Sequence, residues 1–152
     1  MYEQTRRFTR ADRGAAIPVI PDLEYLPAGI DTNEALTALQ HALIAWEEAS
    51  SVRFTLQPPE VFGVDVAALE TSEEIIRVQF HDTYSDIPNT SGTLGIGGAR
   101  FFLTDGGGGT VKGLACFPSV DGRVKLNHDK TSLQDPLTLE SVLTHEIGHV
   151  LG

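Results

Sequence analysis

Three residues near the end of the sequence have the types and spacing that metal-activated hydrolysis requires. His145, Glu146 and His149 form the pattern His-Glu-x-x-His. On a helix, positions i and i+4 lie on one face about one turn apart, so the two imidazoles can bind one zinc ion. Glu146 can accept a proton from a water that this ion activates, while the ion polarises the scissile carbonyl. The pattern therefore predicts a zinc-dependent hydrolase with Glu146 as general base.

A helix must position these residues, and the flanking sequence favours one. Asp135 is a candidate N-cap, Pro136 suits the first helical position, and Thr138 is a second candidate cap. Gly148, between the two histidines, lowers helix propensity by about 1 kcal/mol relative to alanine. A glycine at this position predicts close packing against another backbone. Apolar residues recur at helical spacing as Val142, Leu143, Ile147, Val150 and Leu151.

The longer pattern from His145 through His149 to Gly152 resembles the metzincin metalloproteases. In that family a third histidine follows the glycine by three residues, because a left-handed glycine lets the chain turn back toward the metal. The resemblance implies that the third zinc ligand and the Met-turn lie beyond Gly152, so the sequence is expected to be part of a longer catalytic domain. A zincin with a glutamate as third ligand is an alternative that fits Gly152 less well.

Two further segments resemble the matrixin branch of the metzincins, the matrix metalloprotease-like catalytic domains. Residues 42–54 resemble the matrixin helix whose tryptophan precedes a strand, and residues 92–95 resemble the Gly-Thr-Leu-Ala segment. In matrixins the next strand is the sheet edge that receives the substrate, so the resemblance implies peptide binding by the backbones of Leu94, Gly95 and Ile96. An ordinary inner strand is the alternative. The family also implies a secreted or extracellular location.

The periodicity of the chain predicts an α+β fold, a twisted mixed sheet of about five strands with two helices packed against it. This arrangement looks like the N-terminal subdomain of a matrixin, expected over residues 16–152, with residues 1–15 as a disordered or leader segment. Asp31 and Glu34 form a candidate capping box, and Pro18 suits an edge strand. Strands are predicted at residues 16–20, 52–56, 76–80, 93–103, 111–117 and 123–127, and helices at 32–49 and over the histidine pattern.

The composition limits the classes of partner. A length of 152 residues with 41% hydrophobic residues fits one globular domain, and no apolar run has the length of a membrane span. No signal peptide is visible in the first residues. The net charge of −10 argues against nucleic acid as a partner. We expect a monomer that acts on peptides or proteins, with Cys116, the single cysteine, as a buried and inert thiol.

Structural zinc is not expected where the vertebrate-type matrixins hold it. Those proteins use His-x-Asp and two later histidines, whereas His81 lacks an aspartate at that spacing. Ile96 and Lys125 stand roughly where the other two ligands would be. His81 and His128 are therefore expected to lie on the surface.

Calcium is a secondary expectation, based on the positions that hold this ion in the family. Asp86, Asn89 and Asn127 lie near those positions, and their oxygens are the ligand type that calcium prefers. Lys130 opposes this expectation, because it stands where a carboxylate would be wanted.

Two classes of function remain open from the sequence. The first is a zinc endopeptidase in which His145 and His149 bind zinc and Glu146 is the general base. The second is a protease-like fold that binds peptide or metal without catalysis. The presence of Glu146 favours the first class, because binding alone does not require a proton acceptor.

Overall fold

The computed structural model describes residues 5–101, 109–111 and 113–152. The elements, in chain order, are β1 (Thr5–Arg7), α1 (Thr9–Asp12), β2 (Ile17–Asp22), α2 (Thr32–Ala49), β3 (Phe54–Leu56), the 3-10 helix η1 (Val66–Ala68), β4 (Ile75–Gln79), β5 (Gly95–Phe101), β6 (Thr110–Val111), β7 (Leu114–Leu126), the 3-10 helix η2 (Thr131–Gln134) and α3 (Pro136–Leu151). The expected α+β class is confirmed. Seven described strands and three α-helices replace the expected five strands and two helices.

The sheet is built on a parallel path in the order β1-β7-β4-β2-β3. Antiparallel pairing is confined to β5 and β6, which both pair with β7. The sequence predicted a mixed sheet, and this is corrected, because the main path of the sheet is parallel. The prediction failed because strand direction depends on how distant segments pair, which periodicity within one segment does not report.

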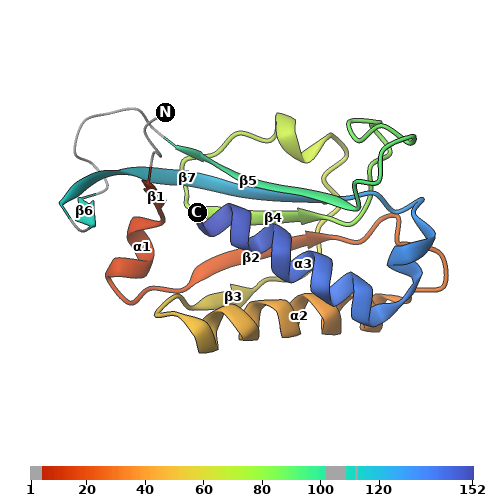
Figure 1. The fold of residues 1–152 in the computed structure, drawn as a ribbon, viewed down its shortest axis with the longest axis horizontal. Helices are drawn as coiled ribbons and strands as arrows, with labels where there is room; N and C mark the ends of the chain where they lie inside the picture. Colours follow the sequence, from red (N-terminus) through yellow and green to blue (C-terminus); the bar gives the residue numbers. More distant parts are fainter. Residues whose placement is uncertain (1–4, 102–108, 112) are drawn as a thin grey trace.

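Both long helices contribute to one hydrophobic core on the sheet. Figure 1 shows α3 crossing in front of the strands, with α2 running beside it below β3. Fully buried residues from five elements fill the space between them, including Ile17, Leu39, Ile76, Leu126 and Leu143. The apolar stripes predicted on the two helices are therefore the faces that attach them to the sheet.

Helix α2 has the bounds that the sequence predicts, because its signals are local. The side chain of Asp31 accepts a hydrogen bond from the amide of Glu34, and the side chain of Glu34 accepts one from the amide of Asp31. This reciprocal capping box satisfies two of the amides that a helix start leaves unpaired.

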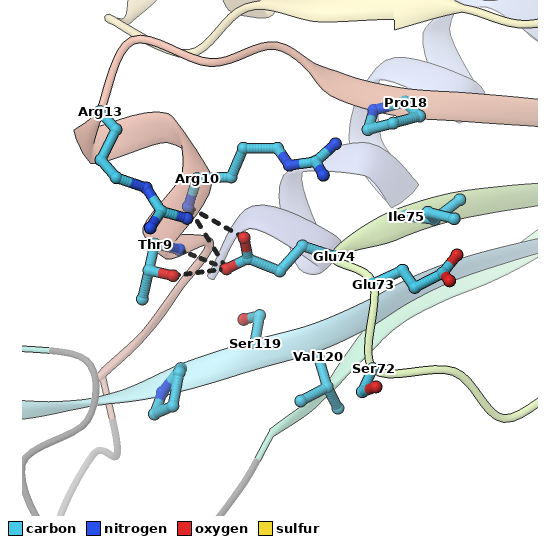
Figure 2. Close-up of a pocket in the computed structure, with 11 residues that line it drawn as sticks. Thr9, Arg10, Arg13, Pro18, Ser72, Glu73, Glu74, Ile75, Ser119 and Val120 are labelled. Atoms are coloured by element: carbon cyan, nitrogen blue, oxygen red, sulfur yellow. Dashed lines mark hydrogen bonds between the residues drawn. The ribbon is translucent and has the colours of Figure 1, made fainter.

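The N-terminal segment differs from the prediction of disorder over residues 1–15. Residues 5–12 form β1, which pairs with β7, and the single helical turn α1. The Glu74 carboxylate accepts hydrogen bonds from the amides of Thr9 and Arg10, and Figure 2 shows it pointing at this backbone in a pocket of ≈ 660 Å³. Glu74 has a φ of 53°, which few non-glycine residues adopt. A carboxylate 64 positions away along the chain thus anchors the segment, which no local pattern indicates.

Two strand predictions also require correction. Pro18 does not lie in an edge strand, because β2 runs between β3 and β4. The prolyl nitrogen is tolerated there because pairing with β4 begins only at Val19. The separate strands predicted at 111–117 and 123–127 are parts of one strand, β7, whose first half pairs with β1 and whose second half pairs with β4 and β5. Residues 102 and 103 of the strand predicted at 93–103 lie outside the described residues.

Candidate functional site

Helix α3 begins where the sequence predicts. Asp135 is the N-cap, and its carboxylate accepts hydrogen bonds from the amide of Thr138 at 2.8 Å and from its hydroxyl at 2.7 Å. Thr138 is thus a donor to the cap and not the cap itself. These hydrogen bonds hold the pKa of the Asp135 carboxyl below its ordinary value, since they stabilise the charged form. Pro136 follows at the helix start, where its missing amide hydrogen is no loss.

The two histidines of α3 present the same ring nitrogen to a shared point. The Nε2 atoms of His145 and His149 lie 3.0 Å apart, and the ring planes meet at 87°. Two nitrogens bound to one tetrahedral zinc ion at 2.0–2.1 Å would lie about 3.3 Å apart. Both side chains are exposed, so an ion has access to them. This geometry fits zinc, a metal for which imidazole is a suitable ligand and which the sequence predicts here.

Glu146, by contrast with the two exposed histidines, lies buried against the backbone of β5. It is 7% exposed, and its Cγ packs over Gly95. A Cβ atom added at Gly97 would lie 2.8 Å from the carbonyl carbon of Glu146. Side chains at these two positions would push α3 away from β5. The glycines therefore allow α3 to rest directly on β5, the strand that is the candidate substrate edge.

Gly148 serves a different contact from the one that the sequence predicts. A Cβ atom there would lie 2.7 Å from Cζ2 of Trp46, so the glycine makes room for an indole ring of α2 and not for another backbone. The indole Nε1 of Trp46 donates a hydrogen bond of 2.8 Å to the carbonyl oxygen of Thr144. The tryptophan that contributes to the matrixin resemblance therefore fixes α2 against the helix of the metal ligands.

Strand β5 has the position that a substrate-binding edge requires. Among the described strands it pairs only with β7, which leaves its other side without a strand partner. A pocket of ≈ 330 Å³ brings together Leu94 and Gly95 from the start of this strand with His145 and Glu146 from α3. Ile96 is 48% exposed and lines a different pocket, beside Lys125. Two of the three predicted substrate-binding residues thus share a pocket with the predicted base.

The described residues supply two protein ligands at this centre. No third histidine, cysteine, aspartate or glutamate of the described part of the chain completes a group with His145 and His149. His128 lies elsewhere, with its ring 6.1 Å from that of His81 and 6.5 Å from that of Tyr25.

The prediction that His81 lies on the surface is wrong. This residue is 1% exposed, since it follows the inner strand β4 and the ring of Tyr25 packs edge-on against it at 5.2 Å. A single histidine after an apolar strand carries no local signal of burial. The grouping of His81 with Asp22 and Glu24 was also missed, because it depends on the pairing of β2 with β4.

A second feature that the sequence did not indicate is a buried lysine among carboxylates. Lys125 is 4% exposed, and its ammonium contacts Asp65, Asp86 at 2.6 Å and Asp82 at 3.7 Å. Burial lowers the pKa of Lys125. Its hydrogen bonds to Asp65 and Asp86 raise the pKa by more than burial lowers it, so the pKa lies above the ordinary value. For Asp65 the directions are reversed. Burial raises the pKa of this carboxyl, but the hydrogen bonds from Lys125 and Ala67 lower it by more, so the pKa lies below its ordinary value.

These lysine contacts bear on the expectation of calcium. Lys125 engages the carboxylate of Asp86, and the ammonium of Lys130 donates hydrogen bonds of 2.7 Å to the carbonyl oxygens of Asn89 and Ser91. The Nδ2 of Asn127 donates to the carbonyl of Thr93. A calcium ion at these residues would have to compete with two ammonium groups for oxygen ligands.

Comparison with known proteins assigns no family to the chain. No protein-family model matches it, and no curated protein matches it at a significant level. No helix among the described residues has both the length and the apolar character to cross a membrane.

Proposed function

We propose that this chain carries the catalytic helix of a zinc endopeptidase of the metzincin type, with the matrixins as the nearest branch. One observation carries the proposal. His145 and His149 hold their Nε2 atoms 3.0 Å apart, while Glu146 lines a pocket with His145 and the start of β5. A metal-ligand pair, a carboxylate between the ligands in sequence and an unpaired strand edge together support metal-dependent peptide hydrolysis.

The residues of the chain have distinct roles in the proposed reaction. His145 and His149 hold the zinc ion, and the resemblance places a third histidine beyond Gly152. The ion supplies Lewis-acid activation of the attacking water and of the scissile carbonyl. Glu146 accepts the proton of that water and then donates it to the leaving amine. Its burial against Gly95 restricts the side chain, so the carboxylate has little rotational freedom to lose during proton transfer.

The substrate in this proposal is an extended peptide that pairs with the free side of β5. The added strand would lie along the backbones of Leu94, Gly95 and Ile96, although the carbonyl of Leu94 already accepts a hydrogen bond from the amide of Asn127. Leu94 and Gly95 border the pocket of Glu146, which brings the peptide backbone next to the base. Gly152 has a positive φ of 110°, which glycine adopts readily, and this supports the proposed turn of the chain after the helix.

The test is a pair of glutamine variants in the complete protein. Glu146→Gln removes the proton acceptor but keeps the shape of the side chain in its position on β5. We expect zinc content to equal that of the unmodified protein while cleavage of a quenched fluorescent peptide falls at least about a thousandfold. Glu140→Gln is the matched control, because Glu140 lies on the same helix, is half-buried and pairs with His41 at 2.9 Å. That variant should keep full activity.

The outcomes separate the two classes of function. Peptide hydrolysis that survives Glu146→Gln would show that another group is the base. Stoichiometric zinc without hydrolysis in the unmodified protein would favour the second class, a protease-like domain that binds peptide or metal.

A further inference from the structure

We infer that Asp22, Glu24 and His81 form a second zinc site, separate from the histidines of α3. Their ligand atoms, one from each side chain, all lie within 4.8 Å of one another. The three residues come from two segments that the sheet brings together, since Asp22 ends β2 and His81 follows β4 by one residue beyond Phe80. This site does not depend on the proposed peptidase function.

His81 and Asp22 pair with each other at a distance that also suits two ligands of one ion. Nε2 of His81 lies 3.4 Å from Oδ2 of Asp22. Hydrogen bonds from nitrogen to oxygen have lengths of roughly 2.7–3.2 Å. An imidazole nitrogen and a carboxylate oxygen on one tetrahedral zinc ion would lie about 3.4 Å apart, from bond lengths of 2.0–2.2 Å. Asp22 is thus the partner of the Nε2 atom of His81, which is 1% exposed, at a distance longer than most hydrogen bonds between nitrogen and oxygen.

The groups around these two side chains hold them in a ligand orientation. Nδ1 of His81 lies 3.0 Å from the hydroxyl of Thr83, which leaves Nε2 as the nitrogen directed at the site. Asp22 accepts hydrogen bonds of 3.0 Å from the amides of Glu24 and Phe62. Such outer contacts orient ligands and set the histidine tautomer in metal sites.

The composition of the group selects zinc over calcium. Calcium takes six to eight oxygen ligands and seldom an imidazole, whereas zinc binds a nitrogen and two carboxylates in a four-coordinate site. Glu24 is exposed, so an ion can reach the site from solvent, and three protein ligands leave a fourth position for water. A bound ion would connect the ends of β2 and β4 to the loop that follows β2, away from the face that carries α3.

The experiment removes the first site and titrates the second. In the complete protein carrying His145→Ala and His149→Ala, calorimetry with Zn²⁺ should show one ion per chain, and Co²⁺ should give the visible absorption of a four-coordinate centre. Glu24→Gln in this background should weaken Zn²⁺ binding at least tenfold without unfolding, since the side chain is exposed. Glu140→Gln is the matched control, because it belongs to a histidine–carboxylate pair that has no third group.

Nuclear magnetic resonance identifies the ligand nitrogen directly. Zn²⁺ should shift the Nε2 resonance of His81 and leave that of His41, the histidine of the control pair, unchanged. Three results would each overturn the inference: no stoichiometric zinc in the double variant, equal affinity after Glu24→Gln, or displacement of zinc by an equal concentration of calcium. Because both α3 histidines are absent, loss of this site would leave the proposed peptidase function untouched.

Discussion

Replacing Lys125, the buried lysine of β7, tests how much its ion pairs contribute to the stability of the fold. Lys125→Met keeps the aliphatic stem but removes the ammonium that faces Asp65, Asp82 and Asp86. Removal of one partner from a buried ion pair costs about 3–5 kcal/mol, because the remaining charge stays buried and unpaired. The Asp86 side chain is 54% exposed and can turn to water, so we expect the lower end, about 3 kcal/mol. For a domain of this size the melting temperature would fall by roughly 6–12 °C.

Urea unfolding followed by tryptophan fluorescence measures this change. The single tryptophan, Trp46, packs on Gly148 between α2 and α3, so its emission reports the core directly. Lys130→Met is the control, since its ammonium binds only loop carbonyls at the surface and should cost less than about 1 kcal/mol. A loss below about 0.5 kcal/mol for Lys125→Met would refute the reasoning that its charge is required.

The dependence on pH provides an independent check of the same cluster. The lowered pKa of Asp65 means that its contribution to stability is present above about pH 4, its ordinary value, and is lost as pH falls through the folded-state pKa. The raised pKa of Lys125 means that its contribution is present below about pH 10 and is lost as pH rises through the folded-state pKa. The stability difference between Lys125→Met and the unmodified protein should therefore shrink at both extremes.

Three further predictions concern the catalytic helix. Gly97→Ala should destabilise the protein by about 1–3 kcal/mol and weaken zinc binding, because the new Cβ meets the backbone of Glu146, whereas Gly98→Ala has open space and should do neither, as calorimetry can show. Trp46→Phe should cost about 1 kcal/mol in urea unfolding through loss of the indole hydrogen bond to α3; no change would mean that this bond does not hold the helices together. Residues 1–152 alone should bind zinc weakly at His145 and His149, show no peptidase activity and exchange amide hydrogens rapidly from His149 onward, and stoichiometric zinc held by these two histidines after dialysis against a mild chelator would contradict this.

The elements that the sequence predicted well are those whose signals lie within a few residues. Helix α2 begins and ends where the capping box and the apolar spacing place it, and α3 begins at Asp135 for the same reason. The burial of Cys116 also agrees with the prediction from its apolar neighbours. Each of these outcomes depends on short-range sterics and hydrogen bonds, which the order of residues already contains.

Signals within a few residues could not predict where β5 and the N-terminal segment lie. Whether β5 lies inside the sheet or at its edge depends on its pairing with β7, which runs from Gly95 with Leu126 to Phe101 with Ser119 and has β4 on its other side. The N-terminal turn forms because Glu74 reaches its amides, and nothing within residues 1–15 indicates that contact. Pairing of this kind is set by the packing of the whole chain, so a strand pattern alone leaves it open.

The sequence by itself determined the chemistry of the proposed catalytic centre. His145 and His149 share a helix face because the rise and twist of an α-helix leave no other arrangement for positions four apart. Only the tertiary structure decided what surrounds them, with Glu146 against the glycines of β5 and Trp46 under Gly148, and only it buried His81 beside Asp22 in a separate group. Those neighbours come from distant segments. They lie together because all the elements share one core, in which the packing and the polar contacts of every element must be satisfied at once.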